Sequence, residues 1–110
     1  MRYIKTGDFL RVRIAVTYQN TKTPVDLTGC SAFSQMRKTP GDELMAEGTV
    51  TIDAENGLIT VYYSSDQTEN LEPGTYGYDI RFVSQNEVKT IYEEQLKFTA
   101  PYTEMNTEGD

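Results

Sequence analysis

The sequence predicts an all-β fold: a single immunoglobulin-like or jelly-roll-like β-sandwich of about seven antiparallel strands, with flexible terminal arms. Hydrophobic and polar residues alternate with a period of two in several stretches, as in strands with one buried side. Turn residues separate these stretches at intervals of roughly eight to twelve residues. No segment carries a helical hydrophobic stripe longer than one turn. We expect the sandwich to span residues 1–100 and a polar, acidic tail or arm to span 101–110.

The first half of the chain contains two clear alternations. The first runs over residues 9–19, with an inward side made of Leu10, Val12, Ile14, Val16 and Tyr18. A short extended piece follows and ends at Gly29. The second alternation runs over residues 30–37 and has an inward side made of Cys30, Ala32, Ser34 and Met36. Phe33 therefore faces outward.

The middle of the chain predicts a broken strand and a hairpin. Residues 44–53 form one strand whose weak point at Glu47-Gly48 indicates a bulge or a change of sheet. Asn56-Gly57 is the strongest hairpin signal in the chain, because both residue types accept the positive φ of a tight turn. The return strand follows at once.

The second half predicts a helical turn and two long strands. The polar segment 64–70 forms the turn, with a cap at Ser65 or Asp66. The strand over residues 88–100 changes phase between Tyr92 and Leu96, which predicts a bulge there.

The turn that precedes residues 75–83 resembles the tyrosine corner of immunoglobulin-like sandwiches. Pro73 and Gly74 make the turn, Leu71 closes it from below, Tyr76 bonds back to it, and Tyr78 points inward. The residues that we expect to determine the fold are Gly29, Asn56, Gly57, Leu71, Pro73, Gly74, Tyr76 and Tyr78.

Composition argues against several functions. The formal net charge of −7 argues against nucleic acid, and no apolar run is long enough to cross a membrane. The chain has no histidine and a single cysteine, Cys30, so we expect no enzymatic activity and no catalytic, metal-binding or cofactor-binding residue. Charge is also uneven, +5 over residues 1–38 and −12 over residues 39–110, which favours head-to-tail contact between copies unless the strands of both halves interleave.

Candidate interface residues lie in three regions. An outward Phe33 among Arg11, Arg13 and Arg37 has the composition of an interface anchor, the alternative being an isolated exposed aromatic. The N-terminal arm contributes Arg2, Tyr3, Ile4 and Lys5, whose alternating polarity suits strand pairing with a neighbour. The C-terminal tail contributes Tyr102 and Met105 as anchors. Surface tyrosines that stack on sugar rings, Tyr62 or Tyr92, are a different possibility.

The order of short motifs along the chain resembles small virion structural proteins of tailed bacteriophages and prophages. The motifs are Gly7-Asp8 before a long strand, Pro24-Val25-Asp26-Leu27-Thr28-Gly29, Ser34-Gln35-Met36-Arg37, Leu71-Glu72-Pro73-Gly74-Thr75-Tyr76-Gly77-Tyr78-Asp79-Ile80 and Val88-Lys89-Thr90-Ile91-Tyr92-Glu93-Glu94. The layout is also similar to the N-terminal anchor module of phage upper-baseplate proteins. The chain departs from the pattern at Phe33, where such sequences tend to carry a polar residue.

The resemblance implies a structural protein of the virion that is made in the host cytoplasm. Its partners would be other virion proteins or further copies of itself. A capsid decoration or cement protein that binds and stabilises the major capsid protein lattice is the favoured role, because the chain ends about ten residues after its last predicted strand. A tail, baseplate or fibre-anchoring adaptor is the alternative, and a host- or glycan-binding module is the second alternative.

Overall fold

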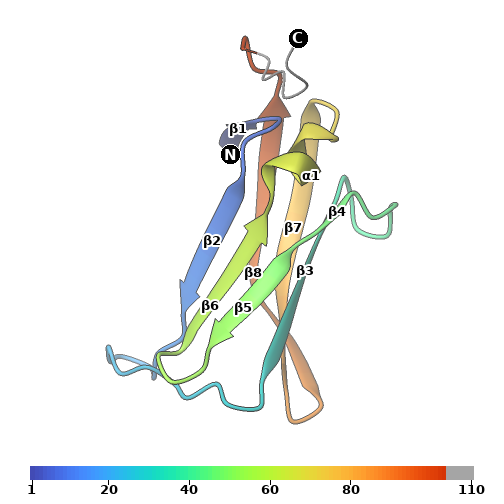
Figure 1. The fold of residues 1–110 in the computed structure, drawn as a ribbon. Helices are drawn as coiled ribbons and strands as arrows, with labels where there is room; N and C mark the ends of the chain where they lie inside the picture. Colours follow the sequence, from blue (N-terminus) through green and yellow to red (C-terminus); the bar gives the residue numbers. More distant parts are fainter. Residues whose placement is uncertain (104–110) are drawn as a thin grey trace.

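The computed structural model describes residues 1–103 and contains two β-sheets packed face to face, which confirms the predicted all-β sandwich (Figure 1). Its elements are β1 (Arg2–Lys5), β2 (Leu10–Ala15), β3 (Ser31–Arg37), β4 (Ala46–Glu47), β5 (Thr49–Asp53), β6 (Leu58–Tyr63), α1 (Ser65–Glu69), β7 (Gly74–Ser84) and β8 (Glu87–Thr99). One sheet has the strand order β1-β8-β7-β3-β4 and the other β2-β6-β5. Among residues 1–103, no helix has the length and apolar character needed to cross a membrane.

The core lies between the two sheets and is made from the inward sides of their strands. Its fully buried side chains include Met36, Ile59, Val61, Tyr63, Tyr76, Ile80, Leu96 and Phe98. One buried polar pair lies within it: the hydroxyl oxygens of Ser34 and Tyr63 are 2.7 Å apart. Because no buried side-chain nitrogen or oxygen of the described residues lacks a partner, this polar pair does not leave an unsatisfied group in the core.

The two alternations of the first half become β2 and β3. In β3, Ala32, Ser34 and Met36 are buried and Phe33 is 59% exposed, so the predicted phase of this strand is confirmed. Strand β2 ends earlier than predicted, at Ala15. Beyond Ala15 an isolated β-bridge joins Thr17 to Pro24, and Tyr18 is exposed rather than inward.

The weak point at Glu47-Gly48 is a change of sheet. Strand β4 pairs with β3, whereas β5, one residue later, pairs with β6 in the other sheet. A Cβ atom on Gly48 would lie 2.9 Å from a methyl carbon of Val61 and 3.1 Å from the ring of Tyr63. Glycine therefore lets the backbone pass close to the core where it crosses between sheets.

The hairpin between β5 and β6 forms where Asn56-Gly57 predicts it, but through a four-residue turn. Asp53 pairs with Leu58, and within the turn only Gly57 has a positive φ, of 62°. The expectation for Asn56 was wrong in this detail. Its side-chain amide instead donates a hydrogen bond of 2.9 Å to the Asp53 carboxylate.

The predicted contacts of the turn before β7 are confirmed. The Tyr76 hydroxyl donates a hydrogen bond of 2.7 Å to the carbonyl oxygen of Glu72, while Leu71 and Tyr78 are buried beside it. The preceding helical turn is α1. Its cap is Ser64 rather than Ser65 or Asp66, because Ser64 and Gln67 form a reciprocal capping box.

The long β7–β8 hairpin turns at Gln85 and Asn86, which both have positive φ. Its bulge lies outside the predicted interval: Ile80 pairs with Tyr92 and Arg81 with Thr90, so the extra residue is Ile91. Downstream of this bulge the inward phase runs without a break to Phe98. The carboxylate in that phase, at Glu94, was the reason for the misplaced prediction.

The N-terminal arm is part of the sandwich, which corrects the prediction of a flexible arm there. Strand β1 pairs with β8 in parallel, from Arg2 opposite Leu96 to Lys5 opposite Thr99. Residues 1–103 therefore form eight strands, seven of them in antiparallel pairs and β1 joined in parallel.

Candidate interaction surfaces

The predicted interface residues that lie in strands occupy two opposite faces and one edge of the sandwich. Phe33 and Arg37 point outward from β3, on the outer face of the five-stranded sheet. Arg11 and Arg13 point outward from β2, on the outer face of the three-stranded sheet. The predicted grouping of Phe33 with Arg11 and Arg13 was therefore wrong, because β2 and β3 belong to different sheets.

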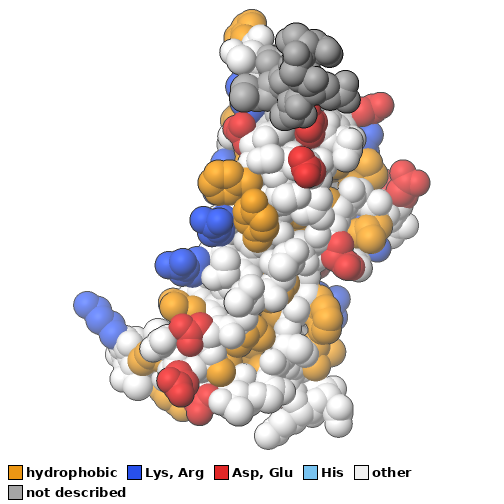
Figure 2. Space-filling view, in the orientation of Figure 1, with side chains coloured by type: hydrophobic (Ala, Val, Ile, Leu, Met, Phe, Trp, Pro, Cys, Tyr) orange, Lys and Arg blue, Asp and Glu red, His pale blue; other side chains and the backbone are white. Residues whose placement is uncertain are grey.

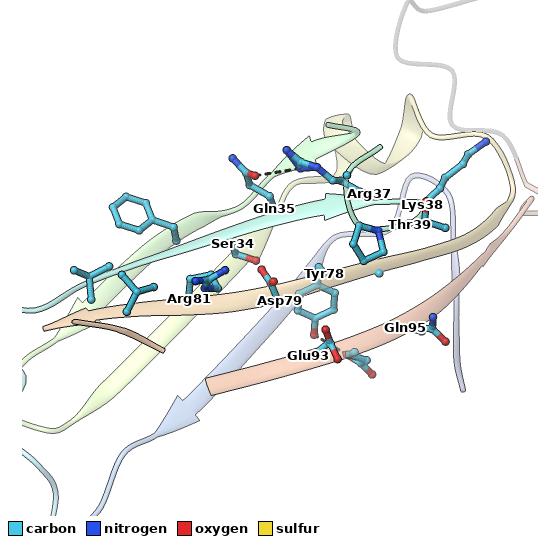
Figure 3. Close-up of a pocket in the computed structure, with 17 residues that line it drawn as sticks. Ser34, Gln35, Arg37, Lys38, Thr39, Tyr78, Asp79, Arg81, Glu93 and Gln95 are labelled. Carbon is cyan, nitrogen blue, oxygen red and sulfur yellow. Dashed lines mark hydrogen bonds between the residues drawn. The ribbon is translucent and has the colours of Figure 1, made fainter. Parts of the chain in front are cut away.

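A shallow groove crosses the outer face of the five-stranded sheet, over β3, β7 and β8 (Figure 3). Its cavity volume is about 770 Å³. Gly77 lies in its floor between the strands that carry Arg37 and Gln95, and contributes no side chain. Lys38 and Thr39 lie at one end, beside the turn that ends at Gly41.

The groove has an apolar end and a polar middle. At the apolar end Val83 pairs across strands with Val88, which is 53% exposed, and Phe33 lies opposite Arg81. In the polar middle, Asp79 lies between Gln35 and Glu93 in one row across the sheet. This combination of exposed apolar groups with arginine and carboxylate groups can hold a protein segment or a polar ligand by contact and hydrogen bonding.

Polar contacts fix the β3 side of this groove. Arg37 Nη1 donates a hydrogen bond of 3.1 Å to Gln35 Oε1, and Gln35 Nε2 donates one of 3.1 Å to Glu47 Oε2. The dashed line in Figure 3 marks the first of these. The Arg37 guanidinium is thereby held along the rim of the groove.

The edge strand β1 is held by a carboxylate on the inner side of β8. Glu94 Oε1 accepts a hydrogen bond of 2.7 Å from Arg2 Nη2 and one of 2.6 Å from the Tyr78 hydroxyl. Burial of Tyr78, together with its hydrogen bond to Glu94, raises the pKa of this tyrosine. Tyr3 and Lys5 lie on the exposed side of β1, so this strand presents side chains while its backbone is already paired on one side.

Replacing Glu94 by alanine should loosen β1 without unfolding the sandwich. We expect hydrogen exchange of the β1 amides to speed up by about tenfold, because hydrogen bonds to a charged group contribute about 1.5–3 kcal/mol each and Arg2 is partly solvated. Glu93→Ala is the matched control, since Glu93 is exposed on the opposite face of the same strand. Equal exchange in both variants would contradict a specific role for Glu94.

The remaining predicted residues have simple positions. Tyr102 is fully exposed after the last strand, and Met105 lies outside the described residues. Of the two tyrosines considered for sugar stacking, Tyr92 faces inward and packs against Tyr78 with ring centroids 6.1 Å apart, so it is not a surface platform. Tyr62 is half-buried on the outer side of β6. Within residues 1–103, no group of three or more acidic or cysteine side chains is placed to hold a metal ion.

Several surface residues were not found from the sequence. The registers of the β3–β7 and β7–β8 pairs bring four of them to the same face as Phe33: Asp79, Arg81, Val83 and Val88. Phe9 lies just before β2, and the sequence pattern predicts only that an alternation begins there. Nothing in the local pattern around Phe9 indicates that its ring packs near Tyr62 of β6.

Comparison with known proteins adds no relative: no protein-family model matches the chain, and no curated protein matches its sequence.

Proposed function

We propose that the protein is a non-enzymatic structural protein of a tailed-phage virion, with a capsid decoration or cement role that stabilises the major capsid protein lattice. The order of motifs along nearly the whole chain supports the virion assignment. The observation that carries the adhesive role is the outer face of the five-stranded sheet, where Phe33 and Val88 are more than half exposed beside the groove. Exposed apolar groups rimmed by polar ones are typical of protein contact sites.

Adhesion on this face would work through a few anchors. An aromatic ring that enters a pocket of a partner contributes a large part of the binding energy of an interface. Arg37 and Arg81 would form ion pairs with carboxylates of that partner. Repetition on a particle then makes modest contacts add up. Sheet edges offer a second mode, because β5 and β2 each have one side without a strand among the described residues.

Phe33→Ala should weaken binding to particles by about tenfold or more while leaving the domain folded, since truncation of an anchor costs roughly 1–2 kcal/mol or more in binding and an exposed ring adds little to stability. The measurement is co-sedimentation of purified protein with particles of the encoding phage that lack it, together with thermal unfolding. Tyr18→Ala is the matched control, because Tyr18 is 56% exposed, lies in the segment that follows β2 and does not line the groove.

The location of the bound protein tests the role itself. Decoration of the shell seen by electron microscopy, with earlier rupture of shells that lack the protein under heat, supports the cement role. Density at the tail tip would instead support the adaptor role. Wild-type protein absent from every part of the particle would overturn the virion proposal.

The groove favours one further candidate function. A cavity of about 770 Å³ lined by Asp79, Arg81 and Glu93 has the hydrogen-bonding groups that a sugar needs, beside an exposed aromatic ring. Specific binding of the isolated domain to a glycan array would favour a host- or glycan-binding module over a structural one.

A further inference from the structure

A second surface lies on the face opposite the groove. We name it the aromatic–arginine patch and define it as Phe9, Arg11, Arg13 and Tyr62, on the outer side of β2 and β6. Figure 2 shows hydrophobic side chains next to Lys and Arg side chains over β2. Phe9 is 53% exposed, and both arginines are exposed. None of these residues takes part in the groove.

Strand register brings the patch together. Arg11 lies directly opposite Tyr62 in the antiparallel β2–β6 pair, and Arg13 lies opposite Thr60, two residues further along the same face. The guanidinium carbon of Arg11 is 5.3 Å from the ring centroid of Phe9 and 5.3 Å from that of Tyr62. The two rings are themselves 6.1 Å apart.

These contacts hold Arg11 in place, and none of residues 1–103 forms an ion pair with it. Stacking on the faces of two rings restricts the exposed side chain and leaves the guanidinium N–H groups available to a partner. Within residues 1–103, the single ion pair joins Arg2 to Glu94, on the other sheet. Arg11 and Arg13 therefore form a positive site on a protein whose formal net charge is −7.

We propose that the aromatic–arginine patch docks a carboxylate-bearing segment of a partner protein. Guanidinium groups bind carboxylates in a bidentate manner, and a pre-stacked arginine loses less freedom when it does so. The flanking rings supply the apolar contact that distinguishes protein interfaces, where Tyr, Phe and Arg are enriched. Nucleic acid fits less well, because two arginines neutralise few phosphates while the rest of the molecule repels them.

The docking site adds a second contact surface to the proposed function. Only the identity of the partner depends on that proposed function. A molecule with a partly apolar groove on one broad face and an anion-binding patch on the other can contact two neighbours at once. Such two-sided contact is what a cement protein requires, and it gains from repetition on a lattice.

A titration of the isolated protein tests the site. The probe is a short capped peptide with two glutamates flanking a leucine, added to isotope-labelled protein and followed by NMR. We expect saturable shift changes confined to β2 and β6 that weaken as salt is raised. Arg11→Gln/Arg13→Gln should weaken binding by about tenfold or more, in line with the loss of interface arginines. The matched control is Lys89→Gln/Lys97→Gln, which makes the same charge change at two exposed positions of β8, in the other sheet and outside the groove.

Three results would overturn the proposal: no saturable binding, equal binding by the Arg11→Gln/Arg13→Gln variant with its fold intact, or stronger perturbation of the same residues by inorganic phosphate or a short DNA duplex. Substitution of glutamine for both glutamates of the probe should abolish binding. Because these measurements use no particles, their outcome is independent of the outcome of the co-sedimentation experiment. Peptide binding without particle binding would preserve this site and remove the virion role.

Discussion

Replacement of Gly57 by alanine is expected to destabilise the sandwich by about 3 kcal/mol. The φ of Gly57 is 62°, a left-handed conformation that costs a residue with a Cβ atom roughly 1–2 kcal/mol. A Cβ atom there would also lie 2.7 Å from the carbonyl oxygen of Val16 and 2.8 Å from that of Val25. Relief of such a clash requires backbone movement, which adds roughly 1–3 kcal/mol.

The clash lies at a junction of several segments, which is why backbone movement is costly. The Gly57 carbonyl accepts a hydrogen bond of 2.8 Å from the Val16 amide, and the Val16 carbonyl accepts one of 2.9 Å from the Val25 amide. The hairpin between β5 and β6 is thus docked against the chain that leaves β2. Movement of any one segment lengthens a hydrogen bond to another.

Gly29→Ala is the matched control for conformational strain alone. Gly29 has a φ of 83°, but an added Cβ atom would meet nothing within 4 Å. We expect a loss of about 1–2 kcal/mol there. Urea unfolding of both variants, with the wild type, gives the difference between them as the cost of the clash. An equal loss of unfolding free energy in the two variants would show that the backbone around Gly57 moves at no cost. Only the positive φ of each glycine would then matter.

The sequence predicted the strands, and which side of each strand is buried, better than it predicted which strands are neighbours in a sheet. The alternation over residues 30–37 is enough to place Phe33 outward, because facing depends on the period of one strand alone. The grouping of Phe33 with Arg11 failed because it depends on sheet membership, which long-range pairing decides. For the same reason the sequence contained no sign that Arg11 stacks on Tyr62, a residue fifty-one positions away that register places opposite it.

Glu94 shows how a polar residue in an inward phase misleads such reasoning. A carboxylate between Tyr92 and Leu96 indicates a break in phase when only the local pattern is considered. In the structure the phase continues, since Tyr78 and Arg2 both donate hydrogen bonds to this carboxylate. The partners come from β7 and β1, and Arg2 is 92 residues away in the chain. A predicted N-terminal arm and a predicted bulge were therefore wrong for one shared reason.

Truncation of Tyr63 to alanine should have the largest effect of all, a loss of about 3–5 kcal/mol, typical of a large aromatic side chain removed from a core. Tyr63 is completely buried, and its ring packs edge-on against that of Tyr78 with the ring centroids 5.8 Å apart. Its hydroxyl also shares a hydrogen bond with Ser34. The truncation both opens a cavity and leaves the buried Ser34 hydroxyl without its partner. Calorimetry or urea unfolding measures the total.

Two smaller substitutions separate the hydroxyl from the ring. Tyr63→Phe keeps the volume and leaves Ser34 unpaired, so it should cost about 1–3 kcal/mol. Addition of Ser34→Ala should recover part of that loss, since both polar groups are then gone. Losses that simply add in the double variant would contradict a direct Ser34–Tyr63 interaction.

The pH dependence of stability gives the hydroxyl an independent readout. Burial raises the pKa of Tyr63 from its ordinary value of 10.0 to about 12. The folded state therefore holds this proton more tightly than the unfolded chain does. The resulting stabilisation is complete below pH 10 and is lost as the pH rises through about 12. Tyr63→Phe lacks this titration, so its unfolding free energy should fall less steeply than that of the wild type between pH 10 and 12. Parallel curves for the two proteins would mean that water reaches the Tyr63 hydroxyl and that the sheets are less tightly packed around it than the structure indicates.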